Sequence, residues 1–279
     1  MTLIFTLHKE VPLSQIHATA IIDSAAEIDP TAEIGPFVVI EGPVRIGART
    51  KLFPHAFVTG NVVIGEDNLV GVNVSIGLPP QHTGWKDTDW GVRIGDRNNF
   101  REHVTIHRGY VENNPTVVGD DNLLMVGTHV PHDAIIHNNV ILVNCAQLGG
   151  HSEVFDRAVL SAFVGIHQFC RVGRLCMLGA SAVATKDVPP FMTMGHDKSV
   201  HGMNIIGMRR AGIGADTRKQ IKAAYKILYR SGLNVKNAVS RMESELGTVP
   251  EVREMIDFIQ SAKRGIVPHT RRATADDDE

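Results

Sequence analysis

The chain has few cysteines, few aromatic residues, no long apolar run and almost no net charge. Its three cysteines, Cys145, Cys170 and Cys176, are too few and too irregularly spaced for a disulfide framework or a CxxC metal site. A formal net charge of −2 argues against a nucleic-acid-binding protein, which usually has a basic face. No run of about 18 apolar residues is present, so we expect no stable membrane insertion. Residues 1–10 also lack the pattern of a signal peptide, and we expect a cytoplasmic protein.

Glycine is abundant where aromatic residues are scarce. The sequence contains 26 glycines, while aromatic residues make up 5% of the chain. A core with few rings must be filled by Val, Ile, Leu and Ala, which suits thin, regular layers. We expect Cys170 and Cys176 to serve as small packing residues in such layers rather than as reactive thiols.

Apolar residues recur at every sixth position from Ile22 to Ala184. Of the 28 positions in this series, 25 are apolar, whereas the overall composition of 43% would give about 12. The three exceptions are His82, Thr88 and Glu112. They lie in the polar segments 78–91 and 109–116, which we predict to be loops extruded from the repeat.

A period of six fits neither an α-helix nor one flat strand, because a helix repeats at about 3.6 and a strand alternates at every second position. It fits a short strand plus a corner, with one large residue pointing inward on each side, and three such hexads close one turn of a coil. We therefore predict a mainly β fold, a left-handed parallel β-helix of hexapeptide repeats, over residues 1–190. The handedness follows from recognition of the fold, because periodicity does not determine it.

The six-residue pattern stops after residue 190, and helical periodicity follows. We predict a small C-terminal helical domain over 191–265 that includes a helix at 216–231, with Asp216 as its N-cap. A second helix should begin at a capping box in residues 248–251 and continue to Ile259. The polar segment 266–279 is predicted to be disordered.

The stretch THVPHD at 128–133 contains two histidines, three positions apart, and an aspartate. Outward residues that are three hexads apart should stack on successive turns, about 4.8 Å from one another. The stacked files around this stretch are His132–Gly150–Gln168, Asp133–His151–Phe169, Pro131–Gly149–His167 and His129–Gln147–Gly165. The period therefore predicts an outward-facing histidine cluster at one corner of the β-helix.

This cluster can perform acid–base chemistry if a substrate has room beside it. We expect Gly149 and Gly150 to leave a notch there and to offer a free N–H. A histidine with a carboxylate nearby takes a proton from a hydroxyl near neutral pH, and Asp133 is the candidate that would orient it. Asp133 as an ordinary solvated corner residue is the alternative. A zinc site of three imidazoles is a further alternative, but we see no supporting set of ligands and predict no metal.

Six stretches of the sequence resemble the UDP-N-acetylglucosamine acyltransferase family. They are IGDRNNFREHVTIHRG (94–109), GDDNLLMVGTHVPHD (119–133), LGGH (148–151), GIHQFC (165–170), DVPPF (187–191) and YKILYRSG (225–232). The resemblance covers residues 22–265. It implies an enzyme that transfers a 3-hydroxyacyl chain from acyl carrier protein to the sugar 3-hydroxyl, the first step of lipid A synthesis. It also implies a homotrimer with active sites between subunits and no cofactor.

The resemblance assigns roles residue by residue. His132 matches the general base, Asp133 its neighbour, and Gly150 N–H the oxyanion donor. The residues that match the donor and acceptor pocket are Gln81, His129, His151, His167, Gln168, Asn204, Arg209 and Arg210. Ala180 and Met177 lie where the family sets acyl length.

Several positions depart from the family pattern. The first loop reads QHTGWK from Gln81 to Lys86, where the family has Gln-Asp-x-Lys-aromatic, and only Gln81 and Trp85 match. Ile206 and Ala211 stand where the family has Glu and Arg. These departures leave open the same chemistry on a UDP-sugar with a 3-amino group, a non-catalytic ligand-binding trimer, and a metal-dependent hydratase on the same fold.

Overall fold

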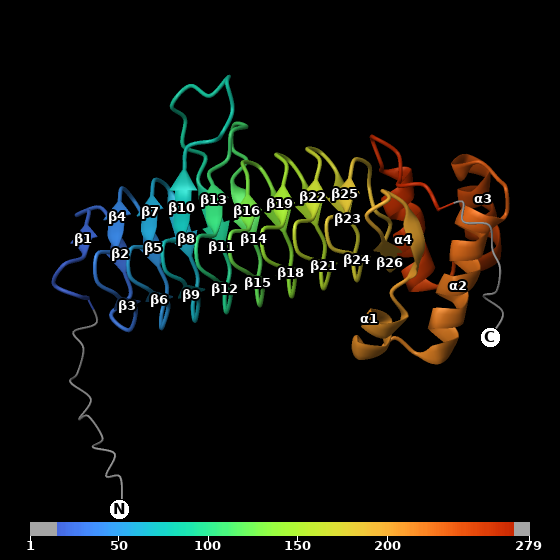
Figure 1. The fold of residues 1–279 in the computed structure, drawn as a ribbon, viewed down its shortest axis with the longest axis horizontal. Helices are drawn as coiled ribbons and strands as arrows, with labels where there is room; N and C mark the ends of the chain where they lie inside the picture. Colours follow the sequence, from blue (N-terminus) through green and yellow to red (C-terminus); the bar gives the residue numbers. More distant parts are fainter. Residues whose placement is uncertain (1–15, 271–279) are drawn as a thin grey trace, which may run out of the picture.

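Most strands are very short, because the chain turns a corner after each of them. In the computed structural model, which describes residues 16–270, these strands form three sheets around a common core (Figure 1). A plain turn consists of three hexads, so that Ile135 lies opposite Glu153 and Ile141 opposite Val159 in parallel register. The six-residue period therefore predicts the architecture correctly: each hexad is one strand and one corner.

The three sheets are distinguished below by their order along each turn. The first sheet contains β1 (Ile21–Ile22), β4 (Val39–Glu41), β7 (Phe57–Thr59), β10 (Ser75–Leu78), β13 (Thr105–His107), β16 (His129–Val130), β19 (Gln147–Leu148), β22 (Gly165–Ile166) and β25 (Val183–Ala184). The second sheet contains β2 (Glu27–Ile28), β5 (Arg45–Ile46), β8 (Val62–Ile64), β11 (Val92–Ile94), β14 (Thr116–Val118), β17 (Ile135–Ile136), β20 (Glu153–Val154) and β23 (Arg171–Val172). The third sheet contains β3 (Glu33–Ile34), β6 (Lys51–Leu52), β9 (Leu69–Val70), β12 (Asn99–Phe100), β15 (Leu123–Leu124), β18 (Ile141–Leu142), β21 (Val159–Leu160), β24 (Met177–Leu178), β26 (Met192–Met194) and β27 (Val200–Met203).

The core is aliphatic. From Ile34 to Ala184 every apolar residue of the six-residue series is buried. The smaller residues two positions earlier, such as Ala134, Ala146 and Ala158, are buried as well. Cys170 and Cys176 are among these packing residues, and burial raises the pKa of the Cys176 thiol to about 12, so it stays uncharged.

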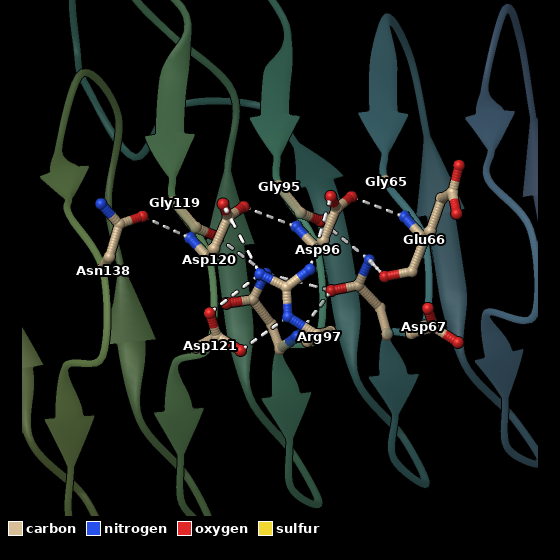
Figure 2. Close-up of polar contacts among 12 residues, drawn as sticks. Gly65, Glu66, Asp67, Gly95, Asp96, Arg97, Gly119, Asp120, Asp121 and Asn138 are labelled. Carbon is tan, nitrogen blue, oxygen red and sulfur yellow. Dashed lines mark hydrogen bonds and ion pairs between the residues drawn. The ribbon is translucent and has the colours of Figure 1, made fainter.

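The corners place non-glycine residues in the left-handed region of backbone space, which costs energy for L-residues. At the corner between the second and third sheets, a ladder of side-chain oxygens compensates for this cost (Figure 2). Oδ1 of Asp120 accepts from Asp96 N–H, and Oδ1 of Asn138 accepts from Asp120 N–H, both at 2.8 Å. Arg97, with φ of 55°, donates to both oxygens of Asp121 at 2.8 and 2.9 Å. Each rung joins one turn to the next, which fixes the spacing of the coil.

Two loops leave the β-helix at the corner between the first and second sheets. One connects β10 to β11 and the other connects β13 to β14, as the sequence predicts near 78–91 and 109–116 (Figure 1). Across these loops Ile76 pairs with Ile106 and Ile94 with Val118, so the sequence separation exceeds the three hexads of a plain turn while the parallel pairing is kept. The insertions are thus accommodated entirely outside the coil.

Four helices follow the coil in the described part of the chain. They are α1 (Ile205–Arg210), α2 (Ala215–Arg230), α3 (Val235–Leu246) and α4 (Pro250–Gln260). Arg171 joins them to the coil: its guanidinium lies 2.7 Å from Oδ2 of Asp187 and donates to Phe258 O at 2.9 Å. Arg174 likewise pairs with Glu254 at 2.7 Å.

Three predictions for this end of the chain need correction. The helical domain predicted over 191–265 begins with strands, because β26 (Met192–Met194) and β27 (Val200–Met203) belong to the third sheet and pair antiparallel, and the first helix starts at Ile205. Asp216 is not an N-cap but lies in the first turn of α2, whose N-cap is Gly214. The capping box before α4 is also wrong, because its N-cap is Val249, which forms no side-chain hydrogen bond.

The segment after α4 is more ordered than its polarity suggests. Ile266 bridges to Asp187 and His269 to Val200. The hydroxyl of Tyr229 donates to Val267 O at 3.1 Å. Predicted disorder is therefore wrong for 266–270, while 271–279 and 1–15 lie outside the described residues.

Candidate functional site

The THVPHD corner lies directly beside the two extruded loops. Its strand β16 follows β13 in the first sheet, and the chain then turns toward β17 of the second sheet. The predicted stacking is confirmed, since His151 N–H donates to His132 O and Phe169 N–H to Gly150 O. Three successive turns therefore present residues at one corner under both loops.

His132 and Asp133 form a buried pair at this corner. Nδ1 of His132 lies 2.7 Å from Oδ2 of Asp133, and the two side chains are 10% and 0% exposed. An ionised carboxylate accepts hydrogen bonds only, so Nδ1 carries the proton and Nε2 keeps its lone pair. This tautomer is the one that a general base requires. The alternative that Asp133 is a solvated corner residue is wrong.

The other oxygen of Asp133 holds the second loop. Oδ1 accepts from the N–H groups of Tyr110 and Val111 at 3.0 Å and from Nδ2 of Asn114 at 3.2 Å. Burial raises the pKa of Asp133, but the hydrogen bonds from His132 and the loop outweigh it and lower the pKa overall. The carboxylate is thus held charged between His132 and the second loop.

His151 lies against the same pair from the next turn. Its ring is 5.1 Å from that of His132 and nearly perpendicular to it, and it stacks on Phe169 at 4.4 Å. Nε2 of His151 is 3.6 Å from Oδ2 of Asp133. Burial lowers the pKa of His151, and the nearby Asp133 charge only partly opposes this. A neutral imidazole at this position can donate or accept a hydrogen bond from a substrate.

The two glycines do not form the expected notch. A Cβ on Gly149 would lie 2.5 Å from the backbone nitrogen of Gln168, so this glycine allows close packing of two turns. A Cβ on Gly150 would lie 2.6 Å from Cε1 and 2.7 Å from Nε2 of His132. The space over Gly150 is therefore filled by the Nε2 edge of His132. Within residues 16–270, the N–H of Gly150 donates no hydrogen bond, so the residue that packs against that edge keeps a free backbone donor.

His129 belongs to a separate pair on the first sheet. Its Nδ1 lies 2.8 Å from Oγ1 of Thr105, and its ring contacts that of His107 at 5.1 Å. Burial lowers the pKa of His129 to about 4, and the neighbouring His107 and His132 contribute to the shift. His107 in turn donates from Nδ1 to Pro79 O at 2.6 Å, which ties the base of the first loop to the coil.

The remaining predicted residues lie at the surface. His167, Gln168 and Gln81 are exposed, and His167 contacts the backbone oxygen of Gln168 rather than another histidine. Ala180 is exposed at the corner between the third and first sheets, and Met177 is half-buried on the third sheet.

The three predicted nucleotide contacts are not brought to His132 within one chain. Asn204 caps α1 by accepting from Gly207 N–H at 2.8 Å, and its Nδ2 donates to Leu175 O at 2.9 Å. Its polar groups therefore already have structural partners. Arg209 and Arg210 are exposed in the last turn of α1 and form no ion pair within residues 16–270. α1 itself lies beyond the last turn of the coil (Figure 1).

Sequence reasoning missed His82, Tyr110 and His107 as site residues. His82 of the first loop and Tyr110 of the second loop both contact the ring of His132, at 5.5 and 5.7 Å between centroids. The sequence signal for His82 was its departure from the family pattern. Tyr110 gave no signal, because the path of an extruded loop is not determined by the repeat.

His132, Asp133 and His151 also form the one group in the described chain that could hold a metal ion, with ligand atoms within 4.8 Å of one another. Two ligands of a tetrahedral zinc ion, each about 2.0–2.1 Å from it, lie roughly 3.3 Å apart. The 2.7 Å between His132 and Asp133 is shorter and fits a hydrogen bond better.

Comparisons with known proteins identify relatives along nearly the whole chain. A family profile described as "Udp N-acetylglucosamine O-acyltransferase; Domain 2" matches residues 187–267. A protein of Thermodesulfovibrio yellowstonii named acyl-[acyl-carrier-protein]–UDP-N-acetylglucosamine O-acyltransferase is 41% identical over 91% of this chain and 99% of its own. The UDP-N-acetylglucosamine acyltransferase structure from Francisella novicida has a TM-score of 0.88 and 37% identity, covering 94% of this chain and 97% of its own.

A second solved structure gives the same result. The UDP-N-acetylglucosamine acyltransferase of Bacteroides fragilis has a TM-score of 0.88 and 38% identity, over 90% of this chain and 99% of its own. The predicted fold, a left-handed parallel β-helix with a small C-terminal helical part, is confirmed. Between residues 16 and 270, no helix combines the length and apolar character needed to cross a bilayer.

Proposed function

Because this chain belongs to the acyl-[acyl-carrier-protein]–UDP-N-acetylglucosamine O-acyltransferase family, we propose that His132 is the general base of that reaction. Nε2 of His132 removes the proton of the sugar 3-hydroxyl, and the oxygen attacks the thioester carbonyl of the acyl carrier protein. The new C–O bond forms and the C–S bond breaks, and the proton passes from His132 to the leaving thiolate. Asp133 holds the tautomer and stabilises the imidazolium that forms.

The observation that carries this proposal is that Gly150, which packs against the Nε2 edge of His132, has a backbone N–H without a partner in the described residues. A thioester carbonyl placed there would have its developing oxyanion within reach of an unpaired donor and its carbon near the activated hydroxyl. Donors of this kind contribute about 10²–10³ in rate. No acyl-enzyme is required, because the acceptor attacks directly.

The other site residues complete the proposal. His151 would hydrogen-bond the sugar, and His129 would line the donor side of the base, where its low pKa keeps it neutral. Gln81, His167 and Gln168 would contact substrate from the exposed rim, and Asn204, Arg209 and Arg210 would bind the nucleotide. Met177 and Ala180 would limit acyl length from the third sheet.

The assembly we propose is a homotrimer in the cytoplasm that acts in lipid A synthesis. Large apolar side chains lie exposed beside the first sheet: Ile21, Phe37, Phe163 and Phe169 are 65%, 55%, 64% and 51% exposed. These exposed side chains, which lie on the first sheet and at its two corners, support an interface on this face. In this assembly we propose that α1 of a neighbouring copy, rather than of the same chain, supplies Asn204, Arg209 and Arg210 to the site.

The test is an assay with acyl carrier proteins of graded chain length and UDP-N-acetylglucosamine, with products read by mass spectrometry. His132→Ala should lower kcat by about 10²–10⁴ while thermal unfolding changes little. His103→Ala, which removes an exposed histidine at another corner, is the matched control. Full turnover in the His132 variant would refute the assignment of the base.

A further inference from the structure

Two residues from different loops form a stacked pair above the base. The ring of His82 stacks on that of Tyr110 with 4.1 Å between centroids and 28° between planes. Both rings meet His132 edge-on, at interplanar angles of 84° and 68°. His132 is therefore surrounded by His82, Tyr110 and His151, and a substrate that reaches its Nε2 must pass beside these rings.

The stacked pair is held in place from both ends. Nδ1 of His82 accepts from Gly84 N–H at 3.0 Å. Gly84 has no room for a side chain, because a Cβ there would lie 2.9 Å from the hydroxyl of Tyr110 and 3.2 Å from His82. Tyr110 in turn donates its N–H to Oδ1 of Asp133. The pair is thus anchored to the same carboxylate that orients His132.

This arrangement fixes what His82 can offer to a ligand. Since Nδ1 accepts a hydrogen bond, the neutral imidazole carries its proton on Nε2. His82 is exposed, so this N–H donor is available at the mouth of the site. The centroids of His82 and His132 are 5.5 Å apart, which is within the span of a single sugar ring. A donor at that distance from the base can reach the sugar whose hydroxyl the base deprotonates.

We propose that His82 is a specificity-determining residue for the acceptor, which donates from Nε2 to an oxygen of the sugar while Tyr110 holds its ring. This inference rests on the proposed function, because it places the sugar against His132. It concerns binding of the sugar and not of the nucleotide. Its effect should therefore appear in the KM for the acceptor and leave kcat nearly unchanged.

The experiment separates the two roles of His82, which are stacking of its ring on Tyr110 and hydrogen-bond donation from its Nε2. His82→Phe keeps a ring for stacking but removes the donor, whereas His82→Gln restores an N–H at similar reach. We expect His82→Phe to raise the KM for UDP-N-acetylglucosamine about tenfold, the loss of one hydrogen bond, with kcat within about twofold. His82→Gln should recover most of the loss. Thr83→Ala, its exposed neighbour in the same loop, is the matched control and should leave KM unchanged.

A second measurement distinguishes sugar from nucleotide. Calorimetric binding of UDP alone should be the same in the wild type and in His82→Phe, while binding of UDP-N-acetylglucosamine should weaken about tenfold. Equal weakening of both ligands, or no weakening of either, would overturn the proposal, as would a loss of kcat at unchanged KM. The calorimetric measurement does not depend on turnover, so it still tests His82 if the activity assay fails. Loss of kcat in His132→Ala tests the proposed base separately.

Discussion

Nδ1 of His132 lies 2.7 Å from Oδ2 of Asp133, although the two residues are adjacent in the chain. Neighbouring side chains rarely meet in this way in an extended segment, because they point to opposite faces. Here Asp133 has φ of 59°, and the corner brings its carboxylate back beside the imidazole. A backbone conformation that the β-helix requires at its corners thus also builds the pair that we propose to be catalytic.

Asp133→Asn should impair both the base and the loop. The amide cannot stabilise an imidazolium as a carboxylate does, and it also weakens the anchor of Tyr110, Val111 and Asn114. We expect kcat to fall by about a hundredfold or more and the Tm to fall by several degrees. Asp121→Asn is the control, since Asp121 has nearly the same φ, 58°, at another corner. Unchanged kcat in Asp133→Asn would show that the carboxylate only supports the loop.

Gly150→Ala should displace the imidazole of His132. The added methyl would lie 2.6 Å from Cε1, which is closer than any carbon contact allows, so the ring must rotate away. We expect kcat to fall at least about tenfold, with a smaller effect on thermal stability. In Gly202→Ala the nearest atom to the new Cβ is Oγ1 of Thr193 at 3.7 Å, so this control should keep full activity. Normal turnover in the Gly150 variant would contradict the proposed position of Nε2.

The buried histidines should make stability fall on mild acidification. His129 has a pKa of about 4 in the folded protein and about 6.5 when unfolded, so the unfolded chain binds the proton first. The contribution of neutral His129 to the free energy of unfolding is fully present above pH 6.5. It is lost as the pH falls toward 4, and the loss reaches about 3 kcal/mol. Chemical denaturation at pH 7 and pH 5 should show the loss, and His129→Gln should reduce it.

A histidine with the opposite shift provides the control for this prediction. Glu153 raises the pKa of His137 through a 2.8 Å hydrogen bond. This pair stabilises the fold below about pH 6.5 and its contribution is lost as the pH rises through the higher folded pKa. His137→Gln should therefore steepen the fall in stability on acidification. The same pH slope in both variants would count against the assignment of these two groups.

The proposed trimer can be tested at its most exposed aromatic residue. Phe163 is 64% exposed at a corner of the first sheet, and a charge there would be buried in the interface. We expect Phe163→Glu to shift the sedimentation velocity profile from trimer toward monomer. Val235→Glu, on α3, changes another exposed apolar residue outside that face and should leave the trimer intact. A wild-type monomer at micromolar concentration would exclude the proposed assembly.

The repeat made most of the coil predictable. One large inward residue per hexad placed Val130 in the core and His129 and His132 outside it, and the turn of three hexads stacked His132, Gly150 and Gln168 correctly. These features depend on local periodicity, which a single sequence displays. A spacing of three hexads could not show that His107 and His129 lie on successive turns. The second loop makes the turn between their strands longer than three hexads.

The loops and the helix ends were not predictable in this way. The contact between His82 and Tyr110 depends on two loop paths that meet only in space. The space over Gly150 depends on the rotamer of His132, which no sequence pattern specifies. Asp216 and Thr248 resemble caps, but α2 begins after Gly214 and α4 after Val249, and neither residue forms a side-chain cap hydrogen bond.

Asp133 joins the loop to the base through its two oxygens, and this makes the strength of the base adjustable from a distance. Each N–H that the loop directs at Oδ1 draws negative charge from Oδ2, and the pull of Asp133 on the His132 proton weakens accordingly. A substitution such as Asn114→Ala would return that charge to Oδ2 without touching a substrate. If His132 is the base, as we propose, loop variation can therefore tune the reaction rate in evolution while every residue in contact with the substrate stays the same.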